Sequence, residues 1–130
     1  MRIRELIEWL NDLVPFTYFA NEFPPDDPNV NVPDEAAYVT IQPGMGVDPE
    51  TGVSRPNFQI VVRGSRHGME ALETKANEIF DAVTNQSEIT IGTSRVVHIF
   101  AIGSAPQYMG RDANDRPHYA MNFRATIRPG

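Results

Sequence analysis

The 130-residue sequence contains no cysteine, one lysine and one tryptophan, and it has no long run of apolar residues. The lack of cysteine excludes disulfides, thiolate metal sites and thiol-based catalysis. No apolar stretch approaches the roughly 20 residues that a membrane-spanning helix needs. The first ten residues mix charged and apolar side chains, which is not the composition of a secretory signal, so we expect the protein to stay in the compartment where it is made.

Basic residues are also scarce. Eleven lysines and arginines stand against 17 aspartates and glutamates, so the formal net charge is -6, and Lys75 is the only lysine. A protein that reads nucleic-acid sequence needs clustered lysine and arginine to neutralise phosphates, and this balance argues against that class. The length and the hydrophobic share of 41% are those of an ordinary soluble domain, and we expect residues 1–130 to form a single domain.

The clearest structural signal extends from Arg55 to Asn85. Its first part alternates polar and apolar residues, with Phe58, Ile60 and Val62 on one face, which predicts a β-strand. A glycine then interrupts the alternation, and from Met69 the apolar residues recur every three or four positions, which predicts an amphipathic helix. Such a helix buries its apolar side by packing against the sheet that contains its strand, so we expect the core between them.

The remaining segments predict a second helix and further strands. Apolar spacing predicts a helix over residues 2–13, which ends before Pro15. Alternation predicts strands at 36–42, 57–63, 88–91, 96–102 and 119–128, allows a short strand at 16–20, and leaves 23–33, 43–56 and 103–117 irregular. Both faces of 96–102 are apolar, which is typical of an inner strand. The prediction is an α+β fold with a mostly antiparallel sheet of about five strands and two flanking helices.

The sequence contains no recognisable catalytic or metal-binding set. His67, His98 and His118 lie too far apart along the chain to form a helical zinc pair. His98 falls on a largely apolar face of its predicted strand, which favours a hydrogen-bonded core or interface histidine. Residues 112–115 resemble the start of a calcium loop, but the glycine and glutamate that such a loop requires are missing, so we interpret them as a turn. We therefore expect no enzyme activity, metal or cofactor.

Two polar clusters and the tryptophan are candidates for contacts with other subunits or partners. One cluster lies in the turn before the second predicted helix, where the helix dipole disfavours basic side chains. The other lies in the loop before the last strand, where mixed charges can set the register against a partner. For both clusters an intrachain ion pair or a solvated turn is the favoured alternative, and for the tryptophan the favoured alternative is a side chain that lies flat on a neighbouring surface. The candidates are Trp9, Arg63, Arg66, His67, Arg111, Asp112, Asp115 and Arg116.

The irregular segment 43–56 is longer than a simple connection requires, and it is rich in glycine, proline and charged residues. If the strands on either side of it pair, the segment forms the tip of a long hairpin. Such a tip reaches beyond the body of the domain, and our hypothesis is that it contacts a neighbouring copy.

Three segments carry a resemblance to a known family. They are residues 57–64 (NFQIVVRG), the helix that follows, and residues 106–112 (PQYMGRD) leading into 119–124 (YAMNFR). In this order they resemble the small tail terminator proteins of long-tailed bacteriophages, also described as tail completion or minor capsid proteins. The family's proline, aromatic residue and glycine before an acidic turn are matched by Pro106, Tyr108, Gly110 and Asp112. The similarity covers about the last 75 residues, whereas the first 50 match only in outline.

The resemblance implies a structural virion protein, assembled in the host cytoplasm as a hexameric ring at the head-proximal end of the tail tube. Such a ring stops tail growth and joins the tail to the head, so the implied partners are further copies, the tail tube protein and the head-tail connector. Six copies carry a formal charge of about -36, and an acidic pore repels DNA phosphates, so the genome passes without specific binding. Candidate pore or loop residues are Asp26, Asp27, Asp34, Glu35, Asp48 and Glu50.

Two other classes of protein stay open at this point. One is another ring component of the same particle, either a head-tail joining protein or a tail tube subunit, and tube subunits polymerise without a fixed end. The other is a small cytoplasmic binding module or enzyme of ferredoxin-like shape, in which Arg63 and Arg66 bind an anion.

Overall fold

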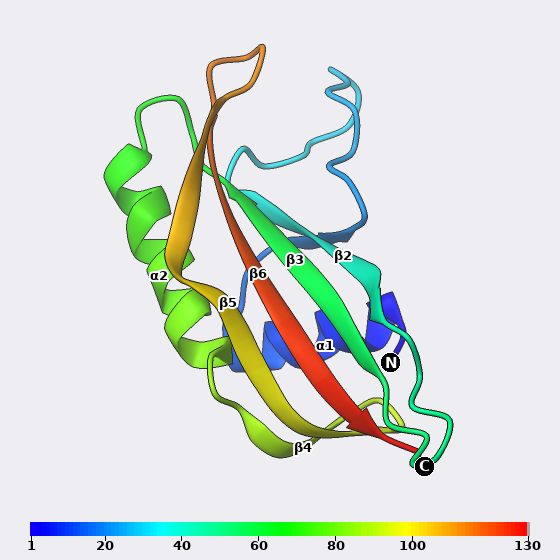
Figure 1. Cartoon of the computed structure of the whole chain (residues 1–130). Helices are drawn as coiled ribbons and strands as arrows, with labels where there is room; N and C mark the ends of the chain where they lie inside the picture. The colour runs from blue at the N-terminus through cyan, green and yellow to red at the C-terminus, as the bar shows by residue number, and fades with distance from the viewer. Residues whose placement is uncertain (130) are drawn as a thin grey trace.

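In the computed structural model of the protein, residues 1–129 form two helices and a six-stranded, strongly twisted sheet (Figure 1). The elements are α1 (Ile3–Leu13), β1 (Tyr18–Ala20), β2 (Ala36–Met45), β3 (Arg55–Arg63), α2 (Met69–Val83), β4 (Ser87–Ile91), β5 (Ser94–Arg111) and β6 (Pro117–Arg128). The strand order is β1-β2-β3-β6-β5-β4. β1 and β2 are parallel, and every other neighbouring pair is antiparallel.

Both helices lie on one face of the sheet (Figure 1). α1 begins where the backbone N–H of Arg2 donates to Glu5 Oε1 at 2.8 Å, and it ends shortly before Pro15, which cannot continue a helix. α2 contacts β3, β5 and β6, whereas α1 contacts β1, β2 and β4. The predicted helices and the predicted strand, turn and helix at residues 55–85 are confirmed.

The core fills the space between the helices and the sheet. Phe58 on β3 and Phe123 on β6 are fully buried and stack with ring centroids 5.2 Å apart. Phe80 on α2 meets Phe123 at 5.8 Å, so one aromatic cluster joins the helix to two central strands. These inward residues are those whose period-two and helical spacings predicted burial.

The sheet differs from the prediction in the number and direction of its strands. The segment at Tyr18–Ala20 does form a strand, so the sheet has six strands within residues 1–129, and it is mixed. The reason is the long connection at residues 21–35, which returns the chain to the starting end of β1, so β2 runs parallel to β1. A parallel pair requires a long crossover of this kind.

The prediction that residues 103–117 are irregular was wrong for most of that segment. β5 continues to Arg111 and pairs with β6 through register shifts between Ile102 and Gln107 and between Tyr108 and Gly110. Gly103 and Gly110 adopt φ values of 100° and 91°, which allow the chain to bulge and remain in the sheet. Only residues 112–116 form the predicted turn.

β5 lies between β6 and β4, as an inner strand should, but only one of its faces is buried. Val96 is 1% exposed and faces the helices, whereas Phe100 and Ile102 are 52% and 46% exposed. A register shift between Val96 and His98 moves these apolar residues to opposite faces of the sheet. The predicted inner strand is therefore confirmed, although the apolar face that carries Phe100 and Ile102 is not covered.

The loops gather at the two ends of the sheet. The connection 21–35, the turn 64–68 and the turn 112–116 lie at one end, and the β2–β3 loop 46–54 lies at the other, beside the end of β6 (Figure 1). The expected pairing of the strands that flank 43–56 is confirmed, but β2 extends to Met45 and β3 begins at Arg55, so only residues 46–54 are irregular. Within residues 1–129, neither helix is long and apolar enough to cross a membrane.

Candidate functional site

The two polar clusters predicted from the sequence lie against each other at the end of the sheet where the three loops gather. Arg111 Nη1 donates to the carbonyl oxygens of Arg66, at 2.9 Å, and Asp115, at 2.6 Å. Arg66 Nε lies 3.8 Å from Asp115 Oδ2. The turn before α2 and the turn before β6 are thereby joined, although they lie about 45 residues apart in the sequence.

Arg116 is the centre of an ion-pair network at this end of the sheet. The residue is only 8% exposed. Its Nε donates to Asp112 Oδ2 at 2.9 Å, and its two terminal nitrogens donate to the two oxygens of Asp26 at 3.0 and 2.7 Å. Nη1 also reaches Asp34 Oδ1 at 3.4 Å. This bidentate geometry is the strong form of an arginine–carboxylate pair, and it fastens residues 21–35 to the β5–β6 turn.

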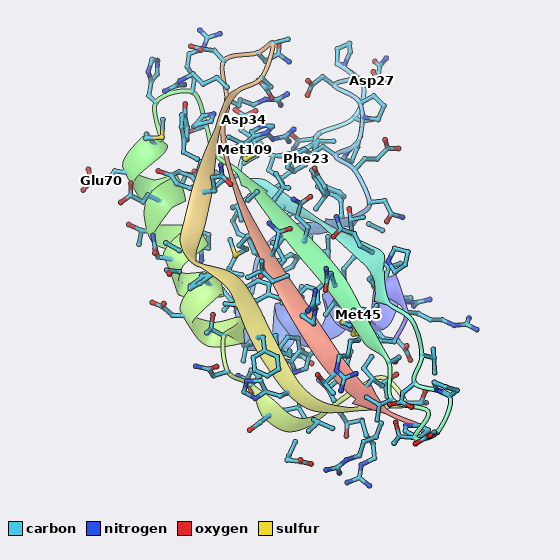
Figure 2. All side chains as sticks on the ribbon, viewed as in Figure 1. Phe23, Asp27, Asp34, Met45, Glu70 and Met109 are labelled. Carbon is cyan, nitrogen blue, oxygen red and sulfur yellow. The ribbon has the colours of Figure 1, made fainter. Side chains whose placement is uncertain are left out.

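Arg63 fastens the same connection from β3. Its side chain is on the face of the sheet opposite the helices, yet the residue is 2% exposed because residues 21–35 cover it. Nε donates to the carbonyl of Asp34 at 2.9 Å, and Nη2 donates to the carbonyl of Pro33 at 3.0 Å. The guanidinium carbon also lies 4.1 Å from the centre of the Phe23 ring, a cation–π contact. Figure 2 shows Phe23 and Asp34 at this end of the sheet.

The charges in this network shift the pKa values of its members. Hydrogen bonds from Arg116 hold the pKa of Asp26 below its usual value. Burial raises the pKa of Asp112, but hydrogen bonds from the backbone and side chain of Arg116 outweigh burial and leave that pKa lowered. The pKa of Arg116 is raised, first by its hydrogen bond to Asp26. All three groups therefore keep their charges at neutral pH, and we call Arg63, Arg116 and their partners in residues 21–35 and 112 the loop clamp.

His118 lies beneath the loop clamp and, unlike the charged residues of the clamp, it is neutral at pH 7. Its Nε2 is 3.4 Å from Asp112 Oδ2, and its ring centroid is 5.6 Å from that of Phe23. Burial lowers the pKa of His118, and the nearby Asp112 only partly opposes this effect. The imidazole is therefore neutral at pH 7, and its buried Nε2 has no well-formed hydrogen bond to any residue that the structure describes.

The other candidates from the sequence do not join this network. Trp9 is half-buried and packs against the core, and His67 is exposed in the turn before α2. Asp27 lies out on the connection, where its Oδ1 accepts the N–H of Asn29 at 2.8 Å (Figure 2). Glu35 and Glu50 are exposed. Whether any of these side chains contacts a partner stays a prediction.

The β2–β3 loop at the opposite end is also fixed by hydrogen bonds. Asp48 Oδ1 accepts the backbone N–H groups of Glu50 at 2.9 Å and Thr51 at 3.3 Å, and the first of these lowers the pKa of Asp48 most. Ser54 and Ile127 exchange backbone hydrogen bonds of 3.1 and 2.9 Å, so the base of the loop joins β6. The loop is therefore a second ordered surface, at the other end of the sheet from the loop clamp.

Sequence reasoning missed two parts of the loop clamp, Phe23 and the carbonyl of Pro33, and it also missed His118 beside the clamp. It found the charged residues but separated them into interface and pore candidates, because Arg116 and Asp26 are 90 residues apart. The one available signal was the excess of aspartate in residues 21–35 against two clusters of arginine elsewhere. In residues 1–129 no group of histidine, aspartate and glutamate is placed to hold a metal ion, and the carboxylates of the clamp face arginine.

By its architecture the chain is a small α+β protein with both helices on one face of a mixed sheet and its loops clamped at the two ends. The family model for "Bacteriophage tail terminator protein" matches residues 5–129, and the chain belongs to this family. It is a structural protein of the phage tail and a component of the virion. The resemblance found in the sequence is therefore confirmed.

A comparison with solved structures gives the same fold. A chain of the structure titled "Virion of native gene transfer agent (GTA) particle" superposes with a TM-score of 0.64 at 18% identity, over 97% of this chain and 90% of that chain. At this identity the likeness concerns the fold alone. A comparison with curated proteins gave no match.

Proposed function

We propose that the protein forms a ring, of six copies as the family resemblance implies, that caps the head-proximal end of the tail tube. The ring ends polymerisation of the tube protein and presents its other side to the head-tail connector. The observation that carries this proposal is the family match over residues 5–129. The proposed role needs binding surfaces and no chemical step.

The two ordered loop regions support a protein that contacts different partners at its two ends. The loop clamp fixes residues 21–35 and 112–116 at one end of the sheet, and Asp48 and Ser54 fix the loop at the other. A loop that is already ordered loses less conformational entropy when it binds. We assign one end to the tail tube and the other to the connector.

The ion pairs in the loops reduce the set of acidic residues proposed to line the pore. Asp26 and Asp34 pair with Arg116 within the subunit, so their charges are compensated in part. Asp27, Glu35 and Glu50 are exposed, and they are the better candidates for an acidic lining that keeps DNA from binding. We retain the proposal that DNA passes through the ring without specific contacts.

The assembly state of the purified protein tests the proposal. We expect closed rings of uniform diameter in negative-stain electron microscopy and one matching mass in analytical ultracentrifugation. Adding the protein to growing tail tubes should stop elongation and leave one end of each tube capped. Open-ended tubes of the protein alone would identify a tube subunit instead, and a persistent monomer that leaves tube ends bare would reject the proposal.

A further inference from the structure

The face of the sheet opposite the helices is bare around the middle of β5. Phe100 and Ile102 are 52% and 46% exposed there, and Met45 at the end of β2 is 56% exposed. Together with Arg55 and Arg124 they line one shallow hollow of about 500 Å³. Large apolar side chains gathered at one place on a surface mark a contact site more often than the same residues scattered singly.

Arginines surround this apolar centre. The strand registers place Arg124 opposite Phe100, Arg95 opposite Arg128, and Arg55 opposite Met45. Arg128 pairs with Glu88 at 3.1 Å, whereas Arg55, Arg95 and Arg124 form no ion pair with any side chain in the described residues 1–129. Four of the 11 basic residues of an acidic chain therefore lie around this apolar centre. We call Met45, Arg55, Phe100, Ile102 and Arg124 the sheet patch.

The outward side of α2 has the opposite character. The helix buries Leu72, Ile79 and its other apolar residues against the sheet, so residues 70, 74, 78 and 81 lie on the far side. Glu70, Glu78 and Asp81 are exposed there, and Glu70 projects away from the body of the domain in Figure 2. Lys75 is the only basic residue of α2, and its Nζ binds Glu78 at 2.7 Å.

The same side of α2 is shaped to receive bulky side chains. Glu70, Ala71, Thr74 and Glu78 line a shallow hollow of about 570 Å³, together with His67, Gly68 and Lys75. Ala71 and Thr74 are small and exposed, and the two glutamates lie beside them. We call these four residues and Asp81 the helix patch. Carboxylates next to small residues complement arginines next to large apolar residues in both shape and charge.

We propose that the sheet patch of one copy binds the helix patch of the next copy, and that this contact repeats around the ring. The inference deepens the proposed function and rests on it, since it names the surfaces that hold the ring together. The contact joins two different surfaces of the subunit, so it is heterologous, and a heterologous contact produces a closed ring when its rotation divides a full turn.

Two other occupants of the sheet patch fit the surface less well. A symmetric pair of sheet patches would place arginine against arginine, which costs energy. DNA would place phosphates over Phe100 and Ile102, whereas an apolar centre with an arginine rim is the composition of a protein interface. Arginine and aromatic residues are also the side chains that most often carry binding energy in such interfaces.

Two single substitutions and their mixture test the proposal. Phe100→Asp disables the sheet patch, and Thr74→Arg disables the helix patch. Because both residues are exposed, the thermal midpoint of each monomeric variant should stay within a few degrees of wild type. Each variant alone should associate at least about 100-fold more weakly than wild type, because a central contact is lost. Mixed together they should form 1:1 dimers and nothing larger, since only one functional pair of patches remains.

Val30→Asp is the matched control, because Val30 is 55% exposed and lies outside both patches, so this variant should assemble like wild type. Wild-type rings that persist in both patch variants would overturn the inference and leave the proposed ring intact. Loss of assembly in Phe100→Asp but not in Thr74→Arg would indicate a symmetric contact between sheet patches. Intact rings with weaker binding of Phe100→Asp to a DNA duplex would assign the patch to DNA. A wild type that stays monomeric would reject the proposed function itself.

Discussion

Replacing Arg116 by alanine should destabilise the protein by opening the loop clamp. The substitution removes the guanidinium that joins Asp26, Asp34 and Asp112. Asp26 and Asp34 are about half exposed, so water replaces the lost partner and we assign those pairs no energy. The side chain of Asp112 is only 22% exposed, and the loss of its charged hydrogen bond costs about 1.5–3 kcal/mol.

A loss of about 2 kcal/mol corresponds to a fall in thermal midpoint of about 6–10 °C for a domain of this size. Circular dichroism at pH 7.5 measures this difference, and limited proteolysis should show earlier cleavage within residues 21–35. Arg95→Ala is the control, because Arg95 is exposed and forms no ion pair within residues 1–129, so its midpoint should match wild type. A midpoint for Arg116→Ala within about 1 °C of wild type would refute the clamp.

The pH dependence of the same difference provides an independent check. The pKa of Asp112 in the folded protein is lowered, so its contribution is complete above the unfolded value of about 3.9. It is lost as the pH falls through the lower folded pKa. The difference in midpoint between wild type and Arg116→Ala should therefore be constant from pH 7.5 to about pH 5 and shrink below about pH 4. A difference that grows on acidification would contradict this assignment.

Three further substitutions test the core, a turn and the buried histidine. Phe58→Ala should lower the free energy of unfolding in urea by about 3–5 kcal/mol, because Phe58 is fully buried against Phe123. A loss below about 1 kcal/mol would contradict that packing. Gly44→Ala should lower the free energy of unfolding by about 1–3 kcal/mol, because Gly44 has a φ of 65° and a β-carbon there would meet the carbonyl of Arg55. Unchanged stability would show that the turn has another geometry. The free energy of unfolding of wild type should fall between about pH 7.5 and 5.5, because the pKa of His118 is lowered in the folded protein and the unfolded chain takes up the proton more readily. The free energy of unfolding of His118→Gln should fall less over the same range. Equal losses in the two proteins would rule out a contribution of His118 to the pH dependence.

The strand, turn and helix at residues 55–85 were predictable because the spacing of apolar residues within each segment is enough to identify it. Alternation identifies a strand with one buried face, and three-and-four spacing identifies a helix, whatever the rest of the chain does. The continuation of β5 past Ile102 was not predictable in this way. Most side chains from Gly103 to Met109 are exposed, so no pattern of burial marks the strand, and its glycines resemble those of a loop.

The candidate site was predictable in its residues but not in its arrangement. Arg63 was selected because the helix dipole disfavours basic side chains in the turn before α2, and Arg116 because it lies in a loop of mixed charge. The partners come from residues 23–34, which reach both arginines only after the chain has folded. Mixed charges in several loops are compatible with intrachain pairs and with contacts between subunits, so the sequence left both interpretations open. The geometry assigns these two arginines to intrachain contacts and leaves the apolar side of β5 exposed.

The tail lengths of a phage that lacks the gene test the central claim most directly. Electron microscopy of the lysate should show headless tails of uncontrolled length, and wild-type protein supplied from a plasmid should restore finished particles with tails of one length. Finished virions with tails of normal, uniform length in the absence of the protein would contradict the proposal that it ends tail growth.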